Sequence, residues 1–438
     1  MKYYSTNHQS PDVSLQEAVT HGLAPDRGLY MPERLPVIPK AFFNNIAEMS
    51  LPDIAYVVAN TLFSDDIDSE TLKKIVNDTL NFDIPLKHVT ENRHVLELFH
   101  GPTLAFKDVG ARFMARLLSY FNNKQNTSEE RTVNVLVATS GDTGSAVANG
   151  FLNIPGIRVF VLYPKGKVSP IQESQFTTLG GNITAFEVKG TFDDCQALVK
   201  SAFLDQELNE KMVLTSANSI NVARFLPQMF YYFHTYAQLA RNGKSLKHVV
   251  VSVPSGNFGN LAAGLIAKRM GLPIERFIAA NNANDVFFKY LQTGEYNPQP
   301  SIATIANAMD VGAPSNFARI LDLYGNSHEA ITADITGYTY DDETIARTIR
   351  DTYRSTGYLL DPHGAVAYKA LVSDLKPGET GVFLETAHPA KFKETVEGII
   401  GGKVSVPSKL AQFAKGEKQT IKVSASFSAF KKQLLASR

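Results

Sequence analysis

Five short apolar segments that alternate with helix-period segments constrain the fold of this chain more than any other feature. They occupy residues 133–138, 157–163, 248–253, 275–280 and 381–386, and most are rich in valine or other β-branched residues. Such alternation is typical of βα units. Strands that lack a polar face fit a parallel sheet covered on both sides. The sequence therefore predicts an α/β fold with mostly parallel sheets, whose functional loops follow the carboxyl ends of the strands.

The segment before this alternation has a different character. Residues 1–85 mix proline-rich stretches with helical ones, and we interpret them as a small, mainly helical N-terminal unit. The first ten residues, MKYYSTNHQS, are polar and contain no apolar signal-peptide core. The longest apolar runs have the length of a strand and are far too short to cross a membrane. The expected location is therefore the cytoplasm.

Charge and cysteine content exclude several classes of function. The chain of 438 residues has 43 basic and 43 acidic side chains, which predicts neither nucleic acid nor an anionic membrane as a partner. The only cysteine, Cys195, cannot form an internal disulfide, and its helical surroundings favour a packed core thiol. The ten histidines show no HxxH or HExxH pairing, so no metal site is expected. The sequence does not fix the assembly, which we expect to be a monomer or a homodimer.

Lys107 begins a helix with one buried face, since apolar residues recur every four positions from Val109 to Phe121. An ammonium at this end faces the positive end of the helix dipole, and burial against Phe106 adds a desolvation cost. Both effects lower the pKa of the amine, as a Schiff-base lysine requires. The alternative is an ordinary surface lysine beside Asp108.

Two further loops are rich in glycine and small polar residues. Residues 140–144, SGDTG, follow the first apolar segment and open a helix of small residues. Residues 255–260, SGNFGN, follow the third and also open a helix. Consecutive amides at a helix N-terminus can bind a phosphate. Neither loop matches the Walker A or GxGxxG pattern, so the second suits the phosphate of a cofactor better than a nucleotide. The alternative for each is a plain strand-to-helix turn.

The last apolar segment ends in ETAHPAKF. Thr386 is expected to project from the strand end toward the same edge of the sheet as the other loops. His388 is a possible base, although a satisfied structural histidine is the favoured interpretation.

Six motifs, in order along the chain, resemble those of the threonine synthase family in its longer bacterial and fungal form. They are FHGPTLAFKDVGARF, ATSGDTGSA, SANSINVARFLPQ, VPSGNFGN, NAMDVGAPSNF and ETAHPAKFKE. The resemblance begins in SLQEAVTHGLAPDRGLYMPE and reaches KFKETVEGII. It implies PLP fold type II, the fold of the tryptophan synthase β subunit, with two interleaved α/β subdomains around a cofactor cleft in residues 86–400. Residues 401–438 would then form a C-terminal segment.

The resemblance also implies pyridoxal 5′-phosphate as the cofactor and gives roles to residues at matching positions. Lys107 would carry the cofactor as a Schiff base, and Thr386 would hydrogen-bond the pyridine nitrogen. The cofactor phosphate would be held at Gly256, Asn257, Phe258, Gly259 and Asn260. Near the cofactor O3′ and the substrate carboxylate would lie Ser140, Gly141, Asp142, Thr143 and Gly144. The phosphate end of the substrate would contact Asn218, Asn221 and Arg224.

Asp142 departs from the wider fold-type-II pattern, which commonly has asparagine in this loop. Asparagine can donate a hydrogen bond to a phenolate oxygen, whereas an ionised carboxylate cannot. Asp142 therefore either shares a proton with O3′ or points elsewhere.

The activity implied by the resemblance converts O-phospho-L-homoserine and water into L-threonine and phosphate, by γ-elimination of phosphate and β-addition of water. Three alternatives stay open at this point. One is a sibling PLP enzyme, such as a threonine dehydratase or a cysteine synthase. Another is a non-catalytic paralogue that binds PLP or a phosphorylated metabolite. The third is a nucleotide-binding α/β protein, which the missing phosphate-loop signatures disfavour.

Overall fold

Two mostly parallel sheets form the framework of the computed structural model, which describes residues 1–124 and 132–437. The six-stranded sheet has the order β12-β11-β10-β13-β5-β4, and its neighbouring strands are parallel except for β4 and β5. Its strands are β4 (Leu86–Thr90), β5 (Arg93–Glu97), β10 (Val249–Pro254), β11 (Arg276–Asn281), β12 (Ile335–Thr339) and β13 (Thr380–Glu385). The predicted α/β class with mostly parallel sheets is confirmed.

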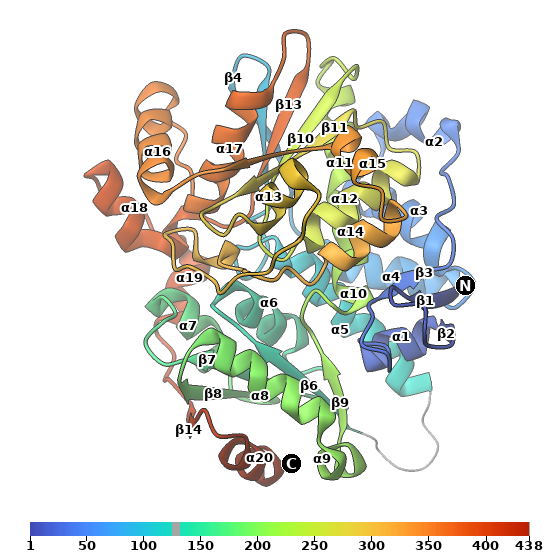
Figure 1. Ribbon diagram of the computed structural model, residues 1–438, viewed down its shortest axis with the longest axis vertical. Coiled ribbons are helices and arrows are strands. Elements are labelled where there is room, and N and C mark those ends of the chain that lie inside the picture. The colour runs from blue at the N-terminus through green and yellow to red at the C-terminus, as the bar shows by residue number, and fades with distance from the viewer. Residues whose placement is uncertain (125–131, 438) are drawn as a thin grey trace.

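The five-stranded sheet has the order β14-β8-β7-β6-β9 and is parallel throughout. Its strands are β6 (Val133–Ala138), β7 (Ile157–Pro164), β8 (Ile183–Lys189), β9 (Val213–Ser216) and β14 (Ile421–Ser424). Figure 1 shows the six-stranded sheet in the upper half of the molecule and the five-stranded sheet in the lower half. The chain passes from the upper sheet to the lower one after β5, returns at β10, and ends in the lower sheet.

Helices cover the sheets because each has an apolar face to bury. Helix α17 packs on β10, β11 and β13, while α8 and α6 pack on β6 and β7. The helices between residues 86 and 400 are α5 (Lys107–Lys124), α6 (Asp142–Phe151), α7 (Pro170–Thr177), α8 (Phe192–Leu204), α9 (Gln206–Lys211), α10 (Val222–Phe225), α11 (Met229–Arg241), α12 (Gly259–Arg269), α13 (Val286–Thr293), α14 (Phe317–Leu323), α15 (His328–Asp334), α16 (Asp342–Thr356), α17 (Pro362–Asp374) and α18 (Lys393–Ile400). Short 3₁₀ turns are η2 (Leu226–Gln228), η3 (Asn307–Met309) and η4 (Pro389–Phe392).

The N-terminal unit is not helical alone. It contains a small antiparallel sheet of order β2-β1-β3, formed by β1 (Lys2–Ser5), β2 (Val13–Ser14) and β3 (Tyr30–Pro32). These strands have two to four residues, too few for a period-2 pattern to appear in the sequence. The helical elements of this unit are α1 (Leu15–His21), α2 (Lys40–Asn45), η1 (Ile46–Glu48), α3 (Leu51–Phe63) and α4 (Ser69–Thr79).

The C-terminal segment completes the lower sheet. It contains α19 (Ser408–Phe413), β14 and α20 (Phe427–Ala436), and α20 packs against α8. Phe430 of α20 lies in the same buried cluster as Cys195 of α8, whose side chain is fully buried. Burial raises the pKa of the Cys195 thiol to about 12, so the predicted core thiol is confirmed.

Candidate active site

Lys107 is the first residue of α5, at the carboxyl edge of the six-stranded sheet. The loop before it runs alongside the loop that follows β13. The Phe106 amide donates to the Thr386 carbonyl at 2.8 Å, and the His388 amide donates to the Leu104 carbonyl at 3.1 Å. These bonds hold Thr386 next to the start of α5, as expected for loops that follow neighbouring parallel strands.

Gly110 sets how closely α5 approaches α10. A Cβ atom there would lie 2.3 Å from the backbone oxygen of Arg224. Arg224 in turn donates from Nη1 to the Lys107 carbonyl at 3.1 Å and from Nε to the Ala217 carbonyl at 2.7 Å. The close contact therefore fixes the backbone that carries Lys107.

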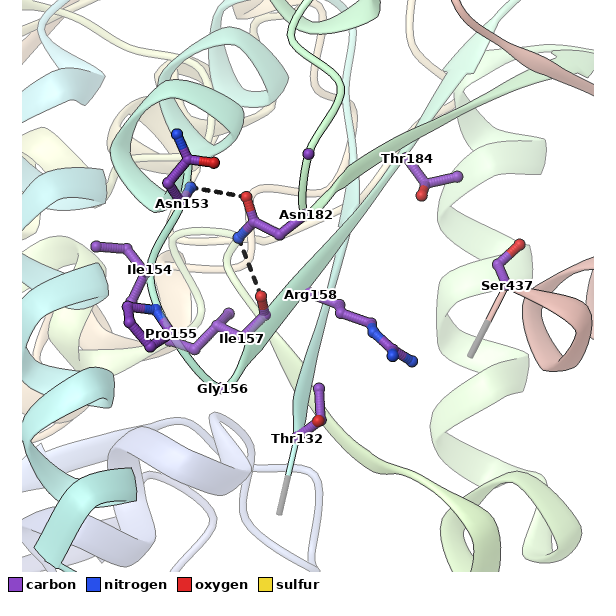
Figure 2. A pocket seen from close by; sticks show the side chains of 11 residues that line it. Thr132, Asn153, Ile154, Pro155, Gly156, Ile157, Arg158, Asn182, Thr184 and Ser437 are labelled. Carbon is purple, nitrogen blue, oxygen red and sulfur yellow. Dashed lines mark hydrogen bonds between the residues drawn. The ribbon is translucent and has the colours of Figure 1, made fainter. Parts of the chain in front are cut away.

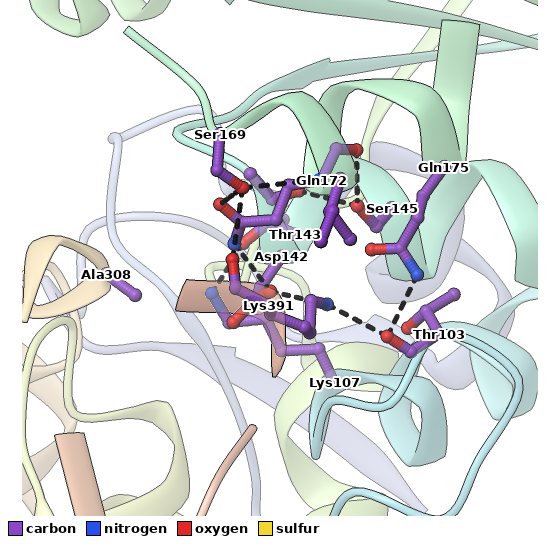
Figure 3. A network of polar contacts seen from close by, with 12 residues as sticks. Thr103, Lys107, Asp142, Thr143, Ser145, Ser169, Gln172, Gln175, Ala308 and Lys391 are labelled. Carbon is purple, nitrogen blue, oxygen red and sulfur yellow. Dashed lines mark hydrogen bonds and ion pairs between the residues drawn. The ribbon is translucent and has the colours of Figure 1, made fainter. Parts of the chain in front are cut away.

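The amine of Lys107 reaches across to the five-stranded sheet. Its Nζ donates to Oγ1 of Thr143, in the first turn of α6, at 2.8 Å (Figure 3). Burial lowers the pKa of Lys107 to about 8; Asp142 opposes this shift, whereas Arg224 and Lys391 add to it. The uncharged amine is therefore a minor form at neutral pH but far more populated than in an ordinary lysine, and it is the form required of a nucleophile or a base.

Asp142 forms a buried ion pair with Lys391. Its Oδ1 accepts from Nζ of Lys391 at 2.6 Å and from Nε2 of Gln172 at 2.8 Å, and Lys391 also donates to the Thr103 carbonyl at 2.9 Å (Figure 3). Burial alone would raise the pKa of Asp142, but Lys391 and Lys107 outweigh it and lower the pKa to about 2. Asp142 therefore stays ionised and cannot donate a proton to a neighbouring oxygen.

The SGDTG loop is built by Thr139 at the end of β6. Its Oγ1 accepts from the amides of Gly141 and Gly144 at 2.9 and 2.8 Å. Gly141 has φ 144°, a conformation that favours glycine, and a Cβ atom there would meet Gln172 at 2.6 Å. Ser140 lies partly exposed beside this turn. The loop is therefore fixed by its own backbone, with the side chains of Ser140 and Thr143 left accessible.

The loop after β10 leads directly into the N-terminus of α12. Phe258 has φ 63°, which is unusual for a large side chain, and its ring is buried. A Cβ atom on Gly256 would lie 2.9 Å from the Ala308 carbonyl, so this position also needs glycine. The amides of residues 256–259 donate to no acceptor among the described residues. This cradle of free donors at a helix N-terminus fits a phosphate group.

A buried arginine supports that cradle from behind. Nη1 of Arg319 donates to Oδ1 of Asn316 at 2.6 Å, and Nδ2 of Asn316 donates to the Asn257 carbonyl at 2.9 Å. Ser219 joins the network, since its Oγ accepts from Nδ2 of Asn257 at 2.8 Å. Because the Asn257 carbonyl and the Phe258 amide belong to one peptide unit, the chain of bonds from Arg319 polarises that amide as a donor.

A second buried network lies beneath Thr386. Oε1 of Glu385 accepts from the Asp361 amide, and Asp361 also accepts from Nδ1 of His363 at 2.6 Å. Burial and the nearby Asp361 carboxylate raise the pKa of Glu385 well above its usual value. His363 accepts from the Ala308 amide at 3.1 Å, which links this network to the backbone beside Gly256.

His388 has a structural role at the start of η4. Its Nδ1 accepts from the Ala390 amide at 3.1 Å and caps η4, and burial lowers the pKa of the ring to about 4. The favoured interpretation of this histidine is confirmed.

The asparagines expected at the substrate, Asn218 and Asn221, and Asn260, expected at the cofactor phosphate, have their side-chain polar groups largely committed. Nδ2 of Asn221 donates to the carbonyls of Val19 and Ser216, and Oδ1 accepts from the Ala223 amide. Asn221 therefore has no free N–H for a substrate, and its helix-capping bonds explain its place in the motif. Asn260 donates to the Pro254 carbonyl and is 5 % exposed. Asn218 is more accessible and donates to the Ala138 carbonyl at 3.3 Å.

Sequence reasoning missed Lys391, Gln172, Glu385 and Arg319. Lys391 stood within the ETAHPAKFKE motif, and Arg319 lies three residues after Asn316 in NAMDVGAPSNF. The available signal for Lys391 is a lysine between two apolar residues, Ala390 and Phe392, in the loop that follows β13.

Comparison with known proteins places the chain in a family. A family model for pyridoxal-phosphate-dependent enzymes matches residues 93–386. Models for the N terminus and the C-terminal region of threonine synthase match residues 2–80 and 364–434. A threonine synthase of Haemophilus influenzae is 46% identical over 413 residues, which cover 94% of each chain. The chain belongs to the threonine synthase family.

Solved structures of this family agree with the fold. The crystal structure of threonine synthase from Escherichia coli superposes with a TM-score of 0.92 at 43% identity and covers 100% of both chains. A PLP-bound threonine synthase from Brucella melitensis has a TM-score of 0.92 at 32% identity, covering 100% of this chain and 99% of that one. Membership of the threonine synthase family excludes the nucleotide-binding alternative and makes the chain a PLP-dependent enzyme.

A cavity of about 420 Å³ lies at the opposite edge of the five-stranded sheet (Figure 2). It is lined by Thr132, Gly156 and Asn182, which precede or begin β6, β7 and β8. It is therefore separate from the site at the carboxyl ends of the strands. Among the described residues no cluster of His, Cys, Asp and Glu could hold a metal ion, and no helix has the length and apolarity to cross a membrane.

Proposed function

We propose that Lys107 and the loops around it catalyse the threonine synthase reaction in this chain. O-phospho-L-homoserine and water give L-threonine and inorganic phosphate, by γ-elimination of phosphate followed by β-addition of water. The observation that carries the proposal is the Lys107 amine, which is buried enough for a pKa of about 8 and donates to Thr143 at 2.8 Å where the two sheets meet.

The residues present suit pyridoxal phosphate. Lys107 would bond to its aldehyde carbon, the free amides of residues 256–259 would hold its phosphate, and the Thr386 hydroxyl would accept or donate at the pyridine nitrogen. When bound, the cofactor withdraws electrons from the substrate and stabilises the charge left when a proton departs from Cα.

Proton transfer is the work of Lys107 itself. An amine with a pKa of about 8 can take a proton from carbon and return it at a pH near neutrality. The hydroxyl of Thr143 accepts from the amine at 2.8 Å and so fixes the direction of its lone pair. The accessible hydroxyl of Ser140 suits the substrate carboxylate.

Arg224 is a candidate for the phosphate end of the substrate. Its Nε and Nη1 are committed to backbone carbonyls, and no acceptor for Nη2 is found among the described residues. Burial lowers the pKa of this guanidinium to about 10, so it keeps its charge at neutral pH. A fixed cation of this kind would stabilise the departing phosphate.

We further propose that the chain is organised as an N-terminal domain of residues 1–85, a catalytic region of residues 86–400 and a C-terminal segment of residues 401–438. The return of the chain to the five-stranded sheet through β14 supports a C-terminal segment that completes the catalytic fold. The balanced charge supports a small-molecule partner rather than a nucleic acid. We also propose that the protein acts in the cytoplasm, as a monomer or a homodimer.

The test is an assay of purified protein with O-phospho-L-homoserine in water labelled with oxygen-18. We expect threonine and phosphate in equal amounts, with the label in the threonine hydroxyl, because water adds at Cβ. Formation of a 2-oxo acid from threonine would favour a dehydratase, and turnover of O-acetylserine with sulfide would favour a cysteine synthase. Binding of the substrate without any product would identify a non-catalytic paralogue.

A further inference from the structure

Lys391 is a buried cation that the chemistry above does not use. Its side chain has no exposed surface, and Asp142, its ionic partner, is 4 % exposed. Two of its three N–H donors are taken, by Asp142 at 2.6 Å and by the Thr103 carbonyl at 2.9 Å. Burying a charge is costly unless it is paired, so a lysine in this place needs an explanation.

We propose that Lys391 is a positioning residue that favours the uncharged form of the Lys107 amine. It would do so by pairing with Asp142 and by opposing a second ammonium in the same pocket. The inference rests on the proposed role of Lys107. Lys391 would control the protonation of the amine although it touches neither cofactor nor substrate in the proposed chemistry.

The charged groups that face Lys107 come from three elements. Asp142 of α6 favours the ammonium form, whereas Arg224 of α10 and Lys391 of η4 disfavour it. The nearby carboxylate of α5 itself, Asp108, is turned toward Thr103, whose Oγ1 donates to it at 2.6 Å. Asp142 is therefore the anion whose effect on the Lys107 pKa Lys391 has to offset.

Removing Lys391 alone would leave Asp142 as a buried carboxylate without its cation. The remaining ammonium within reach is that of Lys107, and pairing with it would hold Lys107 in the charged form. An opposite charge a few ångströms away shifts a pKa by about 1–3 units. Lys391→Met should accordingly move the titration of Lys107 upward by about one unit or more. Asp142→Asn should move it downward, because the anion is then absent while Lys391 remains.

The decisive measurement is the reactivity of the Lys107 amine as a function of pH in the full cofactor-free chain. Trace acetylation by acetic anhydride, read by mass spectrometry on the peptide that contains Lys107, follows the uncharged fraction of this one amine. Lys393→Met serves as the matched control, since Lys393 lies two residues away, is 39 % exposed and pairs with Glu397. The control should leave the Lys107 titration unchanged.

The double variant Asp142→Asn with Lys391→Met separates charge from packing. The two single variants shift the Lys107 titration in opposite directions, so the double variant should titrate close to the unaltered chain. If the single variants acted through damaged packing instead, their effects would add in the double variant. Lys391→Arg, which keeps the charge, should preserve the titration of Lys107. If the pH dependence of Lys107 acetylation is the same in Lys391→Met as in the unaltered chain, the proposal is overturned.

If Lys391→Met alone does not fold, Asp142→Asn is compared with the double variant, neither of which leaves a buried carboxylate unpaired. An upward shift on removing Lys391 in that background supports the proposal, and no shift overturns it. The labelling needs no cofactor and no turnover. A failure of Lys107 to carry the cofactor would appear separately, as attachment at another lysine.

Discussion

Replacing Lys107 by alanine is expected to abolish both threonine formation and covalent retention of pyridoxal phosphate. The variant loses the amine that bonds to the cofactor and the group that moves protons at the substrate. General acid–base catalysis alone contributes about 10²–10⁴-fold, so kcat should fall by at least about 10³-fold. Steady-state assay of threonine and phosphate measures the loss, and visible absorbance together with borohydride reduction measures the attachment.

Lys211→Ala is the matched control, because Lys211 is 45 % exposed and pairs with Glu207 on the same helix. It should keep the activity and the cofactor band of the unaltered chain. A Lys107→Ala protein that still held a borohydride-reducible cofactor would show that another amine makes the bond.

Replacing Arg319 by methionine is expected to lower the free energy of unfolding and to weaken the binding of the cofactor phosphate. Arg319 is 1 % exposed and donates to the backbone oxygens of Ser219, Tyr30 and Ile220 as well as to Asn316. Each buried acceptor left without a donor costs about 1–3 kcal/mol, so the free energy of unfolding should fall by at least about 3 kcal/mol. Denaturant unfolding of the cofactor-free protein measures this change.

The same substitution should weaken cofactor binding, because the Asn257–Phe258 peptide loses the polarising chain that begins at Arg319. Titration with pyridoxal phosphate gives the Kd, and the phosphorus resonance of the bound cofactor reports the environment of its phosphate. Arg347→Met, at a side chain 54 % exposed, is the control and should change the unfolding free energy by less than about 0.5 kcal/mol. An Arg319→Met protein as stable as this control would contradict the account of the cradle.

The continuous apolar runs of the sequence predict the central strands well. The five apolar segments at 133–138, 157–163, 248–253, 275–280 and 381–386 became β6, β7, β10, β11 and β13, with ends that differ by at most one residue. They were found because each is apolar on both faces, as a central parallel strand must be. Strands with mixed burial, such as β4 and β14, carry too weak a pattern, and β14 reaches its sheet from residues that follow all the others in sequence.

The partners within the site could not be predicted in the same way. The loops that carry Lys107, Thr143 and Phe258 follow from local turn chemistry, which a sequence displays. The bond from Lys391 to Thr103 joins residues 288 positions apart, and that from Arg319 to Tyr30 joins residues 289 apart. The first contact joins loops that follow two neighbouring strands of the six-stranded sheet, and the second joins α14 to the small N-terminal sheet. Local sequence patterns do not display contacts of this kind. The ionised state of Asp142 likewise depends on a long-range contact, because Lys391 is its ionic partner.

The most direct test of the central claim is to find the lysine that bears the cofactor. The holoenzyme is reduced with borohydride, digested, and searched by mass spectrometry for the phosphopyridoxyl group. The account predicts the group on Lys107 alone. Its presence on the neighbouring Lys391 instead, with Lys107 unmodified, would contradict the account.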